Sequence, residues 1–180
     1  GQQTILQVIA PWQMFGGLSM LEDVIYPISA QVVEDSQALS WNHEVLLDLV
    51  QRFPQIALNN MSHMAGHVQE MQSRFMELAT ERVERRLART LVRLARQVGK
   101  KVTGGVLIDL PITRQDLAEM SGTTVYTASR TLSEWERQGL IEAGRERVLI
   151  RFPHGLVRIA EDLPLPTSPD DLKQEIFPDE

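Results

Sequence analysis

Hydrophobic and polar residues follow two different periods along this chain. Apolar and polar positions alternate over residues 4–10, 28–34 and 37–41, which is typical of strands with one buried face. Beyond residue 42 most apolar positions recur every three or four residues, as in amphipathic helices. The pattern predicts an α+β fold that begins with short strands and continues mainly as helices.

The longest helical pattern runs from Pro54 to about Thr80, after a short predicted helix at residues 42–53. Its apolar positions are separated alternately by four and three residues over three heptads, at Ala57, Met61, Met64, Val68, Met71, Phe75 and Leu78. So narrow a seam is typical of a two-stranded coiled coil, whereas a helix packed on its own domain usually shows a wider stripe. We predict a homodimer, with the single packed helix as the alternative. The expected interface residues are Met61, Met64, Val68, Met71, Phe75 and Leu78.

Residues 112–139 show two short helices joined by a tight turn at Ser121-Gly122. Thr113 fits the cap of the first helix and Thr124 the cap of the second. The second helix turns three residues inward at core spacing, namely Ala128, Leu132 and Trp135. Its opposite face then carries Tyr126, Ser129, Arg130 and Ser133.

An alternating segment follows at residues 140–152, with a turn at Gly144. Val148, Ile150 and Phe152 would lie on one face of a strand, and they alternate with Arg147, Leu149 and Arg151 on the other. Helix, turn, helix and hairpin in this order are the layout of a winged helix-turn-helix, which reads double-stranded DNA. A helical hairpin with a solvated polar face is the simpler alternative, but it leaves the alternating segment unexplained.

The outward face of the second helix suits contact with the major groove, because an arginine fork can bond guanine and hydroxyl groups adapt to several partners. We predict that the base-reading residues are Val125, Tyr126, Ser129 and Arg130. Phosphate contacts are expected near the starts of the two helices, from Thr113, Arg114, Gln115, Thr124 and Thr127.

Charge is distributed unevenly along the chain, whose net charge is −6. Residues 82–158 hold fifteen Lys or Arg against eight Asp or Glu, a balance of +7, and the remainder holds three against sixteen, a balance of −13. A basic block on an acidic chain is expected of a phosphate-binding domain joined to a domain that avoids DNA.

Several classes of protein are excluded by residues that the sequence lacks. It contains no cysteine, so disulfides, zinc ribbons and cysteine-ligated iron-sulfur clusters are ruled out for this chain. No apolar run approaches a membrane span and no signal peptide precedes the first predicted strand, so we expect a cytoplasmic protein without a membrane partner. No nucleophile with a neighbouring base, paired acids or phosphate loop stands out, so an enzyme is not expected.

The chain resembles the Crp-Fnr family of dimeric bacterial transcription regulators. The motifs are Ile-Thr-Arg-Gln-Asp-Leu-Ala from residue 112, Gly-Thr-Thr-x-x-Thr-Ala-Ser-Arg-x-Leu from residue 122, and Gly139-Leu140-Ile141. The resemblance implies an effector-binding β-roll, of which about half would precede Gly1. The expected domains are a partial roll at 1–53, a dimerisation helix at 54–81, a winged helix-turn-helix at 82–162 and an acidic tail at 163–180.

Within the resemblance, Phe15-Gly16-Gly17 and Pro27 line up with the phosphate cassette of cyclic-nucleotide binders. Those proteins carry an acid where Gly17 stands and an arginine near the place of Pro27. Arg52 is the only Lys or Arg before Phe53, so a cyclic phosphate would be left without a partner. The expected effector is therefore not a cyclic nucleotide.

No cofactor is assigned with certainty. Haem on His43 is considered, as in gas-sensing members of the family, although a lone histidine is more often structural. His63 and His67 lie four residues apart on the long helix, but no third ligand stands at a metal-binding spacing. The resemblance also implies that the predicted loop at residues 99–105, after a helix at 81–98, contacts RNA polymerase if the protein is an activator.

Two hypotheses remain. In the first, a homodimeric transcription regulator binds an inverted-repeat operator under the control of an effector other than cyclic AMP. In the second, the roll and coiled coil mediate protein assembly, and specific DNA binding is weak or absent. Salt-dependent binding to an inverted repeat separates them.

Overall fold

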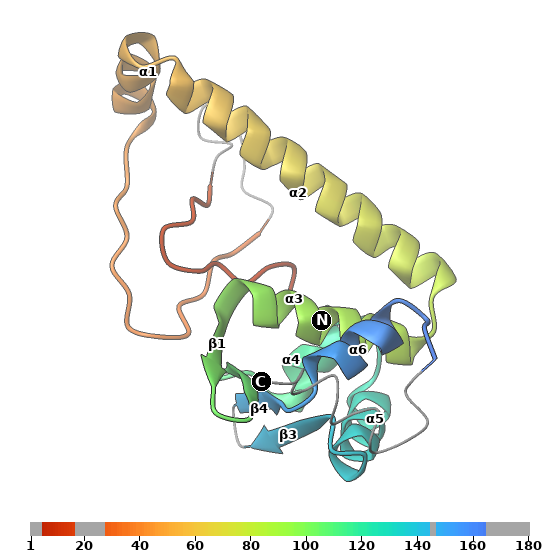
Figure 1. The fold of residues 1–180 in the computed structure, drawn as a ribbon. Coiled ribbons are helices and arrows are strands. Elements are labelled where there is room, and N and C mark those ends of the chain that lie inside the picture. Colours follow the sequence, from red (N-terminus) through yellow and green to blue (C-terminus); the bar gives the residue numbers. More distant parts are fainter. Residues whose placement is uncertain (1–4, 17–27, 145–146, 165–180) are drawn as a thin grey trace, which may run out of the picture. The chain divides into compact units, whose positions relative to one another are not determined.

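The computed structural model describes residues 5–16, 28–144 and 147–164 (Figure 1). These residues form two compact units, one within Ile9–Met76 and the other made of residues 5–8 with those from Glu77 onward. Helices and one small antiparallel sheet make up the fold, so the predicted α+β class is confirmed. In chain order the elements are α1 His43–Arg52, α2 Gln55–Thr80, α3 Val83–Val98, β1 Gly99–Val102, β2 Gly105–Ile108, α4 Arg114–Met120, α5 Val125–Arg137, β3 Ile141–Gly144, β4 Arg147–Ile150 and α6 Pro153–Ala160.

The unit within Ile9–Met76 consists of α1, most of α2 and extended chain. Asn42 caps α1, because its side-chain Oδ1 accepts a hydrogen bond from the Val45 backbone N–H at 2.9 Å. The strand predictions for residues 4–10, 28–34 and 37–41 are wrong for the described residues, since 5–16 and 28–42 contain no strand. Alternation shows which side chains would share a face, but a strand also needs a neighbour with which to form a ladder. Gly17 and Pro27 lie outside the described residues.

The second unit has its core between α3 and a four-stranded sheet. Leu87, Leu91 and Leu94 on α3 are fully buried, and α6 packs along the same helix. The strand order is β1-β2-β4-β3, so the predicted wing strands β3 and β4 continue into a second hairpin, β1 and β2. The wing strands predicted within residues 140–152 are confirmed.

The predicted loop at residues 99–105 is wrong, because its first part is strand β1. Gly99 pairs with Ile108 and Val102 with Gly105, so only two residues form the turn. Gly104 and Gly105 have φ angles of +89° and +148°, which side-chain-bearing residues rarely adopt. A Cβ on Gly105 would also lie 2.0 Å from the Ile150 carbonyl oxygen. Glycines that read as a flexible loop in the sequence here close a tight hairpin.

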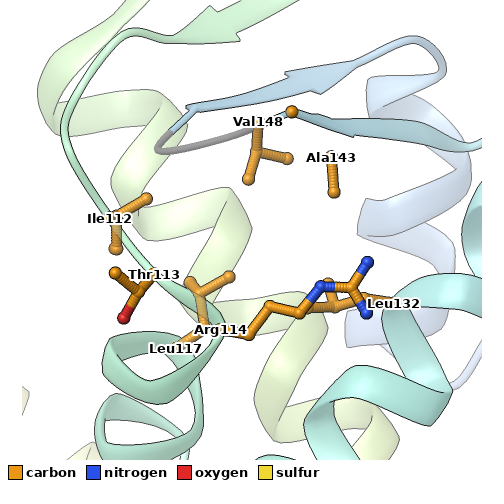
Figure 2. A pocket seen from close by; sticks show the side chains of 8 residues that line it. Ile112, Thr113, Arg114, Leu117, Leu132, Ala143 and Val148 are labelled. Carbon is orange, nitrogen blue, oxygen red and sulfur yellow. The ribbon is translucent and has the colours of Figure 1, made fainter.

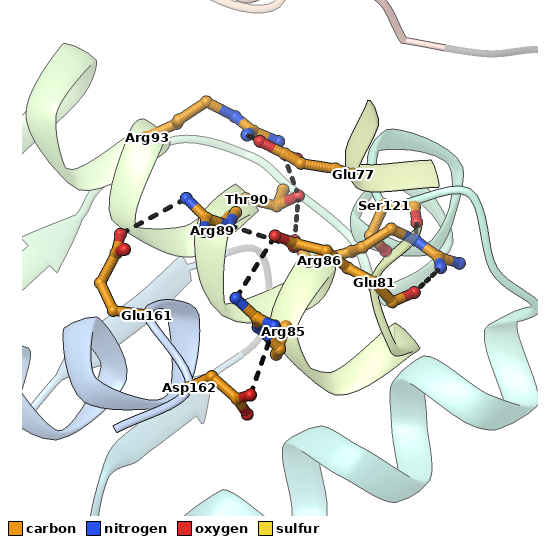
Figure 3. A network of polar contacts seen from close by, with 10 residues as sticks. All are labelled: Glu77, Glu81, Arg85, Arg86, Arg89, Thr90, Arg93, Ser121, Glu161 and Asp162. Carbon is orange, nitrogen blue, oxygen red and sulfur yellow. Dashed lines mark hydrogen bonds and ion pairs between the residues drawn. The ribbon is translucent and has the colours of Figure 1, made fainter. Parts of the chain in front are cut away.

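A network of arginines joins the end of α2 to the rest of this unit (Figure 3). Arg93 Nη1 donates to both carboxylate oxygens of Glu77, at 2.8 and 2.9 Å, and Glu77 is 7% exposed. Arg86 donates to three backbone carbonyls, those of Glu81 at 2.7 Å, Ser121 at 2.9 Å and Gly122 at 3.0 Å. The last turn of α2 is therefore fixed against α3 and against the turn that precedes α5.

Candidate nucleic-acid interface

Helices α4 and α5 form the predicted helix-turn-helix, and each begins at the predicted cap. Thr113 caps α4 by accepting from the Asp116 N–H at 3.1 Å, while Asp116 Oδ2 accepts from the Thr113 N–H at 2.7 Å, which completes a capping box. Thr124 caps α5 by accepting from the Thr127 N–H at 3.2 Å. Between the helices Gly122 has φ +62°, a left-handed conformation that glycine adopts without strain. The local sequence thus determines where both helices start and how the chain turns.

Helix α5 has one buried face and one exposed face. Ala128, Leu132 and Trp135 are fully buried, as predicted. Tyr126 is 77% exposed and Val125 is 38% exposed, Arg130 is exposed, and Ser129 is partly buried. The four predicted base-reading residues therefore lie together on the first two turns of α5.

The two arginines predicted to meet DNA are in different situations. No hydrogen bond or ion pair is found for Arg130 within the described part of the chain, so its guanidinium can form a bidentate contact. Arg114 instead donates from Nη1 to the Ser129 carbonyl and to Ser133 Oγ, both at 3.2 Å, and from Nη2 to Glu136 Oε2 at 3.2 Å. Within the described residues no acceptor is found for the Nε–H and one Nη2–H of Arg114, so these two donors are available to a phosphate. Arg114 is thus a tie between α4 and α5 as well as a predicted phosphate contact.

The other predicted phosphate contacts lie at the same end of the motif. Thr113, Gln115 and Thr124 are exposed, and Thr127 is partly buried, with its hydroxyl 2.9 Å from that of Thr124. Gln115 donates to Glu119 on its own helix at 2.6 Å.

Two arginines of the wing, Arg147 and Arg151, also differ in whether another residue binds the side chain. Arg151 pairs with Glu142 at 2.6 Å and reaches the Gly104 carbonyl at 3.5 Å, so it links the two hairpins. Arg147 is exposed and, among the described residues, has neither an ion pair nor a hydrogen bond from its side chain. Arg147 was not among the predicted site residues, although its place in a basic alternating segment was a usable signal.

A cavity of about 280 Å³ separates α4, α5 and the wing. Ile112, Leu117, Leu132 and Val148 give it apolar walls, and Figure 2 shows the Arg114 side chain extending from α4 toward α5 along one side. Glu136 was not among the predicted site residues, because nothing in helical spacing shows that its carboxylate reaches the wing.

In the described part of the chain no helix has the length and apolar character needed to cross a membrane. Nor do the described residues bring three metal-ligating side chains together, and His63 and His67 contact each other edge to face with ring centroids 4.5 Å apart.

Comparison with known proteins agrees with this geometry. The family model of the Crp-like helix-turn-helix domain matches residues 85–159. The chain is 30% identical over 160 residues to the cyclic AMP receptor protein of Thermus thermophilus, covering 89% of this chain and 71% of that protein. It is 25% identical over 159 residues to the anaerobic regulatory protein of Bacillus subtilis, covering 88% of this chain and 67% of that protein.

Solved structures show the same fold. A CRP/FNR-family transcriptional regulator from Thermus thermophilus matches with a TM-score of 0.55 and 27% identity, over 60% of this chain and 55% of that one. A CooA variant from Carboxydothermus hydrogenoformans matches with a TM-score of 0.60 and 24% identity, over 66% of this chain and 55% of that one. The chain belongs to the Crp-Fnr family of DNA-binding transcription regulators, which are not enzymes.

Proposed function

We propose that the protein acts as a homodimer on an inverted-repeat operator. The observation that carries this proposal is the exposed apolar seam of α2. Its six predicted interface residues have 37% to 71% of their surface exposed in the single chain, Met61, Met64, Val68, Met71, Phe75 and Leu78. A contiguous apolar stripe of this kind needs a partner, and a second copy of the helix supplies a matching one.

The end of the seam also lies against the helix-turn-helix. A Cβ on Gly122 would be 2.4 Å from Cδ2 of Leu78, so the last seam residue touches the turn that precedes α5. Two recognition helices must be held about 34 Å apart to enter successive turns of the major groove. A dimer whose interface includes Leu78 would therefore bring the turn before α5 of each copy close to that interface.

Selection of random DNA by the full chain tests this proposal. We expect an inverted repeat to be recovered, and its affinity to fall steeply with salt because several phosphate contacts release counterions. A salt slope near zero, or recovery of no repeat, would favour the protein-assembly alternative.

The effector is proposed to be something other than cyclic AMP. The relatives' names differ on this point, since one is a cyclic AMP receptor and another an anaerobic regulator. Residues 1–51 contain no Lys or Arg that could neutralise the charge of a cyclic phosphate. We expect cyclic AMP, titrated to millimolar concentration, to leave operator affinity unchanged. A rise in operator affinity that saturates with the nucleotide would refute this. Whether the protein binds haem is tested separately by an absorption spectrum of the purified protein.

If the protein is an activator, the β1–β2 hairpin is proposed as its contact with RNA polymerase. Lys101 is exposed, and Lys100 pairs with Asp109 at 3.1 Å, where both side chains are more than half exposed. We expect Lys100→Ala with Lys101→Ala to abolish activation in a reconstituted transcription assay while operator affinity is kept. Loss of activation and operator affinity together would mean that the hairpin acts through contact with DNA or through folding.

A further inference from the structure

Glu136 joins three elements of the DNA-binding unit. Its Oε2 accepts from Arg114 Nη2 at 3.2 Å, and its Oε1 accepts from the Ala143 backbone N–H at 3.1 Å. Arg114 is the first residue of α4, Glu136 lies in the last turn of α5, and Ala143 is in β3. A single carboxylate thus links both helices of the motif to the wing.

Among the described residues, the bond from the Ala143 N–H to Glu136 is the one side-chain hydrogen bond found between α5 and the wing strands. Strand β3 is the edge of the sheet, so one side of its backbone has no neighbouring strand. Between the wing and the helices lies the cavity of about 280 Å³ lined by Leu132, Val148 and Ala143 (Figure 2). Arg114 and Ala143, the two partners of Glu136, both line this cavity, so the bridge connects residues on its two sides.

The bridge is too exposed to be chiefly a stabilising feature. The side chains of Arg114 and Glu136 are 39% and 31% exposed. Ion pairs this accessible to water add little to folding stability, because solvent screens them. If the bridge fixes the position of the wing without adding much stability, its loss should change the affinity for DNA more than the melting temperature.

We propose that Glu136 is a positioning residue that sets the wing relative to the recognition helix, so that Arg147 of the wing and Arg130 of α5 reach the same half-site. Both arginines are exposed, and among the described residues neither has a hydrogen bond or ion pair. This inference rests on the proposed function, because it assigns the wing a contact with operator DNA. Loss of the bridge would leave Arg147 able to reach a phosphate only part of the time.

The test compares Glu136→Gln with Glu134→Gln in the full chain. Arg114 and Ala143 bond different oxygens of Glu136, so a glutamine would turn its NH2 group, which is a donor, toward one of these two donors. Glu134 lies on the same helix, and the bonds found for it go to Arg137 and Gln138 of that helix end. Each change removes one negative charge, which by itself should strengthen DNA binding. The positioning role predicts the opposite sign for Glu136→Gln alone.

We expect Glu136→Gln to weaken binding to the selected operator about tenfold, as for one lost charge-assisted contact, and to remove backbone protection at the flanks under the wing. Glu134→Gln should bind as well as the wild type or better, and both variants should melt close to the wild type. Glu136→Gln binding like Glu134→Gln would overturn the positioning role alone, whereas a wild type that binds no operator would overturn the proposed function and this role with it.

A double-mutant cycle with Arg147→Ala separates positioning from general structural damage. If Glu136 acts through Arg147, the double variant should bind no worse than Arg147→Ala, because the contact is already lost. Additive losses in the cycle would show that Glu136 does not act by placing Arg147.

Discussion

Replacing Met71 or Phe75 with glutamate is expected to convert the protein from dimer to monomer and to abolish operator binding. Met71 is 69% exposed and Phe75 is 71% exposed in the single chain, so neither change disturbs a core within the protomer. In a two-stranded α2 interface each glutamate would face its own copy, and burying two like charges costs several kcal/mol. Sedimentation equilibrium and operator binding measure the two consequences.

Gln72→Glu is the matched control for this experiment. It adds the same charge to the next position of α2, which is exposed and lies off the seam. We expect it to remain a dimer. Dimers that persist in both Met71→Glu and Phe75→Glu would refute the α2 interface and with it the proposed spacing of the two recognition helices.

Arg130→Ala is expected to reduce operator affinity by about 1–3 kcal/mol and to relax the preference for one guanine in each half-site. The exposed guanidinium of Arg130 has no competing partner among the described residues, so the whole loss should appear in binding.

Arg114→Ala should instead weaken all sequences alike and flatten the salt slope by about one unit, as a phosphate contact does. Arg114→Ala should also lower thermal stability, because Arg114 ties α4 to Ser129 and Ser133.

Tyr126 tests the base assignment itself. A glutamate at this place would offer a carboxylate that can accept from the amino group of cytosine. Tyr126 is 77% exposed and offers a hydroxyl and a ring that can lie against a thymine methyl. We expect the wild type to select A·T pairs there and Tyr126→Glu to shift the selection toward cytosine. Recovery of one and the same half-site by both proteins would show that Tyr126 reads no base.

Much of the DNA-binding unit was determined by local sequence. Thr113 and Thr124 are caps whose partners lie three residues away, and the inward positions of α5 follow from helical period alone. Such short-range rules depend on residue type and spacing, both of which are visible in a sequence. The helix-turn-helix, the wing strands and the exposed face of α5 were therefore predictable.

The errors came where structure depends on distant partners. Alternation in residues 28–41 predicted strands, yet no ladder forms there in the described residues, because pairing is decided by a neighbouring strand and not by the segment itself. Residues 99–102 gave too weak a pattern to be predicted as a strand, and they became one because β2, held by β4, supplied an edge.

The sequence by itself determined the helices, the caps, the seam of α2 and the set of residues that α5 exposes. Only the tertiary structure decided which arginines remain available for DNA. Arg130 and Arg147 are exposed and have no partner among the described residues, whereas Arg114 uses part of its guanidinium to bond Glu136 on another helix, 22 residues away, and keeps only the rest for a phosphate. Side-chain bonds between distant elements depend on how those elements pack, and packing is not contained in the spacing of residues along one helix.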